Sequence, residues 1–121
     1  MDEQLQELGM RMKFLEQQMM QLDQQLQELT SVRDSIEEIS KGAEGQEMLI
    51  PLGAGVFVKG VLKDCKTVKM NVGAGAVVEK SFLDAKRLVE EQIEALENVR
   101  EQMTDEGSKL SQNMQVMQTE E

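Results

Sequence analysis

Apolar residues recur every three or four positions along both ends of this 121-residue chain. A 3.5-residue repeat of this length is typical of a coiled-coil seam. The first series is Met1, Leu5, Leu8, Met12, Leu15, Met19, Leu22, Leu26, Leu29 and Ile36, interrupted by Arg33; the second is Phe82, Ala85, Val89, Leu96, Val99, Met103, Leu110 and Met117, with Gln92, Glu106 and Asn113 at the missing steps. We therefore expect two long helices, residues 1–41 and 80–117, paired as an antiparallel hairpin.

The charge balance excludes some partners. Lys and Arg total 13 against 23 Asp and Glu, which gives a net charge of -10, and the chain has no Trp or Tyr. An acidic chain without stacking aromatic residues is a poor nucleic-acid binder. We therefore expect no nucleic-acid partner.

The scarcity of His and Cys limits the chemistry and indicates the compartment. The chain has no His and a single cysteine, Cys65, so it holds neither a cluster of soft metal ligands nor a disulfide within the chain. The heptads start at Met1, and no run of 18 apolar residues exists. We expect a cytoplasmic protein with no metal and no membrane partner.

A glycine-punctuated segment separates the two heptad stretches. Gly42 and Gly45 end the first helix, and residues 46–52 and 56–62 form two short apolar runs around a Gly-Ala-Gly triplet. Residues 67–72 alternate strictly between apolar and polar side chains before a second Gly-Ala-Gly, 20 residues after the first. This repeat predicts two β-hairpins within residues 46–79, and Pro51 favours an edge strand.

The hairpins are the candidate oligomerisation module. Four short strands on two helix ends have open edges and an apolar face that their own chain covers poorly, so we expect partner chains to close a β-barrel or sandwich. The alternative is a self-contained sheet folded over the helix ends. The candidate interface residues are Leu52, Val56, Phe57, Val58, Val68, Met70, Val72 and Val77.

The Gly-Ala-Gly triplets do not predict a nucleotide site. A dinucleotide fingerprint needs a third glycine where Val58 and Val78 stand, and a phosphate loop near Lys80 needs glycines in place of Ala74 and Glu79. The carboxylates are mostly ordinary flanks of the heptads. We therefore expect no cofactor, no ATP site and no catalytic residue, and we do not interpret the chain as an enzyme.

Apolar side chains gather near the two chain ends, which meet at one tip in a folded hairpin. Methionine repacks around partners of varied shape, so the tips are candidates for weak, promiscuous binding of unfolded chains, strengthened when one assembly carries several tips. Gly9 and Gly107 favour fraying there. Alternatively, Met1, Met12 and Met117 only fill an irregular seam. The candidate binding residues are Met1, Leu5, Leu8, Met10, Met12, Phe14, Leu110, Met114, Val116 and Met117.

The order of helices and hairpin segments carries a family resemblance that covers nearly the whole chain. Residues 49–60 read LIPLGAGVFVKG and residues 72–80 read VGAGAVVEK, between two heptad helices. This arrangement resembles prefoldin of the α class, since the β class has a single hairpin. The resemblance implies an α+β fold in which a long antiparallel coiled-coil hairpin is joined by two β-hairpins, as one domain over residues 1–121.

The same resemblance implies a function and partners. Two α and four β prefoldin subunits would form a hexamer whose hairpins close a double β-barrel. Its tips would capture non-native polypeptides without ATP and transfer them to a group II chaperonin. Two alternatives stay open. A coiled-coil tether or scaffold leaves the β repeat without a purpose, and a filament-forming prefoldin relative would assemble with itself.

Overall fold

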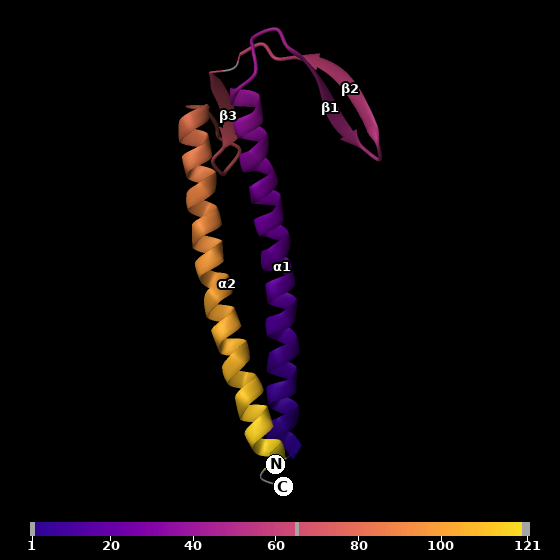
Figure 1. Ribbon diagram of the computed structural model, residues 1–121, viewed down its shortest axis with the longest axis vertical. Helices are drawn as coiled ribbons and strands as arrows, with labels where there is room; N and C mark the ends of the chain where they lie inside the picture. The colour runs from indigo at the N-terminus through magenta and orange to yellow at the C-terminus, as the bar shows by residue number, and fades with distance from the viewer. Residues whose placement is uncertain (1, 65, 120–121) are drawn as a thin grey trace. The chain divides into compact units, whose positions relative to one another are not determined.

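The computed structural model describes residues 2–64 and 66–119, with the side chain of Asp2 left out. In chain order the elements are α1 (Asp2–Ser40), β1 (Glu47–Gly53), β2 (Val56–Val61), β3 (Thr67–Asn71), β4 (Val77–Ser81) and α2 (Phe82–Thr119) (Figure 1). The predicted fold class, two long helices joined by two antiparallel β-hairpins, is confirmed. Contacts divide the chain into a helical unit, Met1–Thr30 with Glu91–Glu121, and a hairpin unit, Ser31–Glu90.

The inner ends of both helices are set by local hydrogen bonds. At the end of α1, Ser40 Oγ donates to the carbonyl of Glu37 at 2.7 Å, and Gly45 follows with a φ of 86°. The helix α2 begins at Phe82, two residues after the predicted start, because residues 80 and 81 still pair with β3. Ser81 Oγ then accepts the N–H of Asp84 at 3.1 Å, which caps the first turn of α2.

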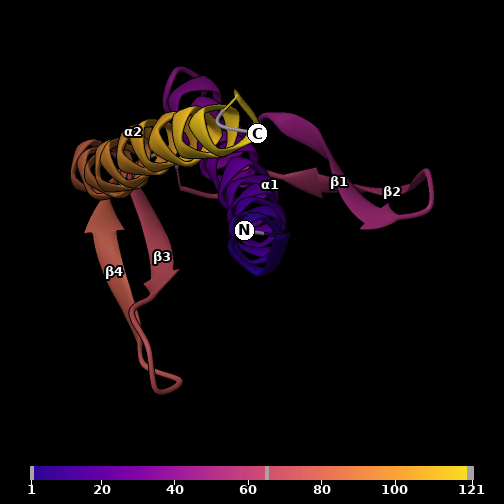
Figure 2. The same ribbon diagram turned by 90° about the horizontal axis from the view of Figure 1, so that it is seen from below.

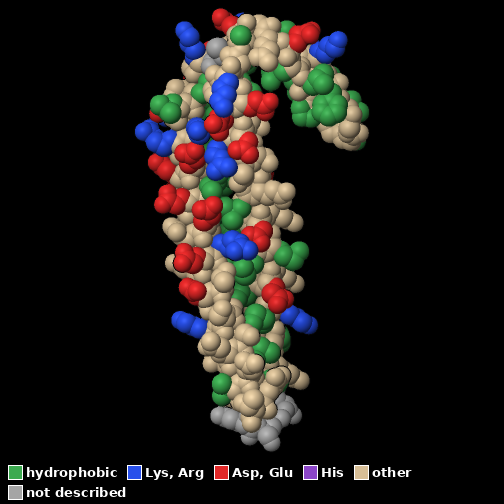
Figure 3. All heavy atoms as spheres, viewed as in Figure 1, with side chains coloured by type: hydrophobic (Ala, Val, Ile, Leu, Met, Phe, Trp, Pro, Cys, Tyr) green, Lys and Arg blue, Asp and Glu red, His purple; other side chains and the backbone are tan. Residues whose placement is uncertain are grey.

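In the helical unit, α1 packs with the predicted seam. Leu15 and Leu22 are buried, and the other described apolar members of the series in this unit are half-buried. Apolar side chains form a stripe between the helices, with charged side chains on either side (Figure 3). The 3.5-residue repeat therefore identified the buried face of α1 correctly.

On α2 the prediction that three polar residues occupy seam positions is wrong. Gln92, Glu106 and Asn113 are exposed. The buried stripe uses the next residue in each case: Ile93 is buried, and Gly107 and Met114 are half-buried. A step of four residues instead of three keeps the polar side chains hydrated and places an apolar or small residue in the seam.

The hairpins form two separate two-stranded sheets (Figure 2). In the first, β1 pairs with β2 from Glu47↔Val61 to Gly53↔Val56, with an irregularity between Pro51 and Gly53. In the second, β3 pairs with β4 from Thr67↔Ser81 to Asn71↔Val77. Within residues 2–64 and 66–119 no ladder joins the four strands, so the chain does not build the single self-contained sheet that was the alternative.

The two hairpin turns repeat each other in geometry as well as in sequence. Gly53, Ala54 and Gly55 have φ values of 114°, 51° and 77°, and the residues 20 positions later have 112°, 51° and 75°. Glycine accepts φ values near 113° without steric cost, whereas a side chain there is strained. The Gly-Ala-Gly repeat therefore has a conformational reason.

Candidate functional site

In the helical unit, Met10 and Phe14 present the most exposed apolar side chains among the predicted tip residues. Met10 is 72% exposed and Phe14 is 62% exposed. They lie four residues apart on α1, so they occupy one face of the helix, off the seam. Val116 on α2 is 53% exposed. These residues can contact another molecule without any change in the helices.

The other predicted tip residues lie in the seam. Leu110 is buried at 8% exposure, so it reaches a partner only if the helices separate. Leu5, Leu8, Met12, Met114 and Met117 are half-buried, and Met1 lies outside the described residues. The structure therefore separates an open surface, Met10 with Phe14, from a set of seam residues that fill the space between the helices.

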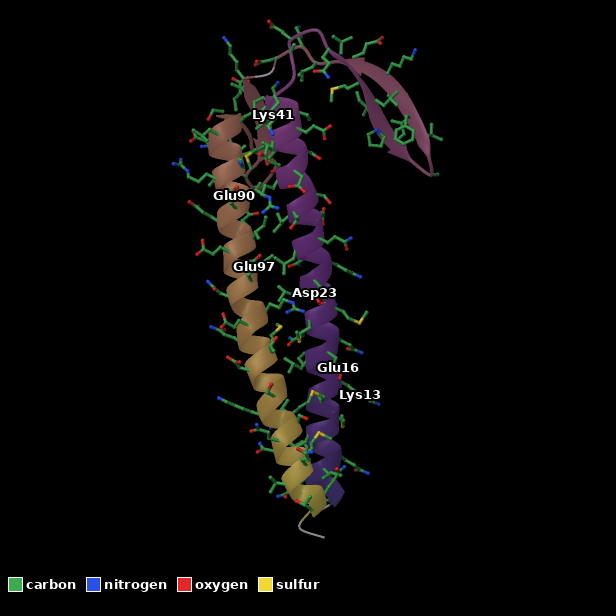
Figure 4. The ribbon with its side chains drawn as sticks, in the orientation of Figure 1. Lys13, Glu16, Asp23, Lys41, Glu90 and Glu97 are labelled. Atoms are coloured by element: carbon green, nitrogen blue, oxygen red, sulfur yellow. The ribbon has the colours of Figure 1, made fainter. Side chains whose placement is uncertain are left out.

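Charged side chains border the Met10–Phe14 surface. Arg11 pairs with Glu7 at 3.1 Å, one turn earlier on α1. Lys13 projects from α1 away from α2, and Glu16 follows it (Figure 4). Both signs of charge therefore stand beside the apolar pair.

In the hairpin unit, most predicted interface residues are exposed. Leu52, Val56, Phe57, Val58, Val72 and Val77 are exposed, whereas Val68 and Met70 are half-buried. Sequence reasoning missed Leu49, Ile50, Val61 and Leu83, which are also exposed. The apolar runs of residues 46–52 and 56–62 were a usable signal for the first three, whereas Leu83 follows the buried Phe82 without a pattern.

The first hairpin is apolar on both faces. By the strand register, Leu49, Phe57 and Val61 share one face, and Ile50 and Val58 share the other. A two-stranded sheet with exposed apolar side chains on both faces has too little of its own chain to cover them. Both faces of the hairpin are therefore available for contact with another chain.

A groove lies between the last turns of α1 and the first hairpin. Its volume is about 560 Å³, and Ile39, Met48, Pro51 and Leu62 contribute apolar lining. The carboxylates of Glu38 and Glu47 also line it. The space-filling view shows a hollow beneath this hairpin (Figure 3). The apolar side chains and the two acidic groups continue the exposed surface of the hairpin.

A short polar network fixes the connection into β3. Asp64 accepts the hydroxyl of Thr67 at 2.7 Å and the backbone N–H of Lys66 at 2.8 Å. These hydrogen bonds hold the pKa of the Asp64 carboxyl below its ordinary value, and the bond from Thr67 has the largest effect. Cys65, the single cysteine of the sequence, lies outside the described residues.

Residues 2–64 and 66–119 contain no group of three or more His, Cys, Asp or Glu side chains placed to hold a metal ion. In the same part of the chain, neither helix has the length and apolar character that crossing a membrane requires.

Comparison with known families identifies the fold. The family model for prefoldin subunits matches residues 9–121. The chain belongs to the prefoldin family. Prefoldin subunit alpha 1 of Thermococcus kodakarensis is 35% identical over 96 residues, covering 74% of this chain and 66% of that protein. Prefoldin subunit 5 of Homo sapiens is 32% identical over 90 residues, covering 74% of this chain and 58% of that protein.

A solved structure has the same fold. The fold matches a chain of filamentous PFD from Methanocaldococcus jannaschii with a TM-score of 0.83 over 100% of both chains, at 18% sequence identity. The resemblance to α-class prefoldin that the two hairpins predicted is confirmed, since several archaeal relatives are prefoldin alpha subunits. The aligned parts cover 66% of the Thermococcus kodakarensis protein and 63% of its Thermococcus onnurineus counterpart.

Proposed function

We propose that this chain is an ATP-independent chaperone subunit that binds non-native polypeptides near the ends of its helices. Membership of the prefoldin family supports a chaperone role. The observation that supports this location of the binding site is the exposure of the side chains of Met10 and Phe14. Neither side chain belongs to the seam, so helix pairing does not account for an apolar residue at these positions, whereas contact with another polypeptide does. We do not propose an enzymatic activity.

The binding energy of one such surface is small. Covering a Met or Phe side chain contributes roughly 1.5–3 kcal/mol, so one surface holds an unfolded chain weakly. Several copies on one assembly raise the overall affinity through effective concentration. Weak single contacts also allow release. This favours an assembly with several surfaces over a monomer as the working unit, and the family resemblance implies that the assembly is a hexamer of two α and four β subunits.

The hairpins supply the proposed assembly surface. Both faces of the first hairpin carry exposed apolar residues, and the groove beside it adds about 560 Å³ of partly apolar space. Hairpins of β-class prefoldin subunits would cover these faces and complete a β-barrel. Transfer of clients to a group II chaperonin in the cytoplasm belongs to the same proposal and follows from the family resemblance.

Assembly and client binding are tested separately. The chain is produced with a prefoldin β subunit, and native mass is measured first. A hexamer supports the proposed assembly, whereas a homodimer indicates a tether. A long homopolymer indicates the filament alternative. The likeness to filamentous PFD gives that alternative only weak support, because at 18% identity it concerns the fold alone.

The client site is tested in the assembled complex by suppression of aggregation of a chemically denatured model protein. The double variant Met10→Ser/Phe14→Ser should lose most of this suppression. Met20→Ser is the matched control, because Met20 is 64% exposed on the same helix yet lies among polar neighbours. Equal suppression by the double variant and the control would refute the proposed client site.

A further inference from the structure

The structure divides the methionines by exposure. Ten methionines occur in the sequence, and nine of them are described. Only two of these nine are exposed: Met10 at 72% and Met20 at 64%. The remaining described methionines, which are half-buried, are Met12, Met19, Met48, Met70, Met103, Met114 and Met117. An oxidant in solution therefore meets Met10 and Met20 first.

The surroundings of the two exposed methionines differ. Met10 has Phe14 one helical turn away, and that ring is itself 62% exposed. One turn on either side of Met20 stand Glu16 and Gln24, both polar. Oxidation of Met10 therefore changes an apolar surface, whereas oxidation of Met20 adds one more polar group to a polar helix face.

We propose that Met10 is a reversible oxidation site that controls binding of non-native polypeptides, an inference that rests on the proposed client site. The oxidant would be a peroxide such as hydrogen peroxide, which oxidises the thioether of Met10. The thioether sulfur attacks one peroxide oxygen, the O–O bond breaks, and the second oxygen leaves as water after taking a proton. Sulfur loses two electrons and becomes a sulfoxide. A dithiol reductase restores the thioether, releasing the oxygen as water and forming a disulfide in the reductase.

The sulfoxide weakens binding for a direct physical reason. It replaces a flexible apolar group with a polar one, which hydrogen-bonds to water and resists burial against a client. Loss of this contact should lower the affinity of one surface for an unfolded chain roughly tenfold. Because several surfaces act together, the loss in the assembled complex is larger than for one surface. The helix itself tolerates the change, since Met10 does not fill the seam.

The first measurement maps the oxidation sites. The complex with β subunits is treated with limiting hydrogen peroxide, and sulfoxide is quantified by peptide mass spectrometry. Met10 and Met20 should oxidise roughly threefold or more faster than Met12 and Met103. Equal rates for all four would overturn the exposure argument.

The second measurement follows binding of an unfolded, fluorescently labelled, carboxymethylated model polypeptide. Each protein is compared with its own untreated form, so the readout is the fold-loss on oxidation. The wild-type complex and Met20→Leu should both lose affinity, and reductase treatment should restore it. Met10→Leu should lose none. A loss in Met10→Leu as large as in the wild type, or no loss in the wild type, would overturn the proposal.

The two hypotheses fail in different ways. If the untreated complex does not bind the unfolded polypeptide, the proposed client site is wrong and the oxidation site falls with it. If the untreated complex binds and the oxidised complex binds equally well, the client site stands and only the oxidation control is rejected. Circular dichroism before and after treatment verifies that lost binding does not result from lost helix.

Discussion

The Nε atom of Arg100 on α2 donates a hydrogen bond of 2.7 Å to Oδ1 of Asp23 on α1, within the helical unit. This hydrogen bond and the negative charge of Asp23 raise the pKa of Arg100 above its ordinary value. Both side chains are about half exposed, at 46% and 49%. The pair therefore links the two helices but contributes little to stability, because exposed ion pairs are weak.

Replacing Asp23 by Asn should lower the melting temperature only modestly, by roughly 1–4 °C. The difference from the wild type should shrink in 1 M salt, which screens exposed charges. Asp34→Asn is the control, because Asp34 pairs at 3.4 Å with Arg33, its neighbour on the same helix. Thermal unfolding followed by circular dichroism measures both. A salt-independent drop would show that the pair acts through something other than charge.

The two helical glycines should respond differently to alanine. A glycine inside a helix costs about 1 kcal/mol relative to alanine. A Cβ added at Gly9 meets nothing within 4 Å, so Gly9→Ala should stabilise the helix by about that amount. At Gly107 the new Cβ stands 3.3 Å from Cδ2 of the buried Leu15, so Gly107→Ala should gain less or lose stability. Chemical denaturation of both variants measures the difference, and equal gains would contradict the packing argument.

Hydrogen exchange at the helix ends tests the fraying hypothesis for the same glycines. If Gly9 and Gly107 loosen the ends, amide protection there should be lower than at Leu22 and should rise in Gly9→Ala. Exchange as slow at the ends as in the middle of the helices would rule the hypothesis out. Client binding by Gly9→Ala then tells whether loosening aids capture.

The sequence predicted the fold class because its signals were periodic and local. The α1 series identified the buried face, and the spacing of the Gly-Ala-Gly triplets identified two hairpins. Prediction failed on α2 at Gln92, because a heptad admits steps of three or four and only the packing selects Ile93. The same repeat placed Leu110 in the seam and Met10 outside it, in agreement with their burial and exposure, but it left out Met114, which the packing half-buries in place of Asn113.

The turn glycines should resist substitution. Gly73 has a φ of 112°, which a residue with a side chain adopts only under strain of about 1–3 kcal/mol. Gly73→Ala should therefore disorder the second hairpin, visible as lost cross-strand nuclear Overhauser effects between Asn71 and Val77. Ala74→Gly is the matched control, because the φ of 51° at Ala74 suits glycine. An intact hairpin in Gly73→Ala would show that the turn adopts another conformation.

The Asp64 carboxyl should titrate below its ordinary range. The Thr67 hydroxyl is the main cause of the lowered pKa, so Thr67→Ala should raise the pKa, whereas Thr67→Ser should retain most of the effect. A carboxyl with a depressed folded pKa contributes stability above its unfolded pKa of about 3.9 and loses it as pH falls through the folded pKa. Carbon-detected titration of Asp64 by nuclear magnetic resonance measures the shift. No difference between Thr67→Ala and Thr67→Ser would contradict it.

Assembly should depend on the apolar faces of the first hairpin. Phe57 and Leu49 share a face, each more than half exposed, so Phe57→Ser removes an apolar contact without opening a core. Covering Phe57 in a partner interface contributes roughly 1.5–3 kcal/mol, so its loss should weaken association with β subunits about tenfold or more. Native mass spectrometry over a dilution series gives the dissociation constant.

The control for this prediction is Lys59→Ser, because Lys59 lies opposite Leu49 on the same face and is already polar. It should leave the hexamer intact. Phe57→Ser should also leave the helix content unchanged, since the side chain is 54% exposed and packs little against its own chain. If Phe57→Ser assembles as well as Lys59→Ser, the apolar face is not the interface, and the opposite face, with Ile50 and Val58, becomes the surface to test.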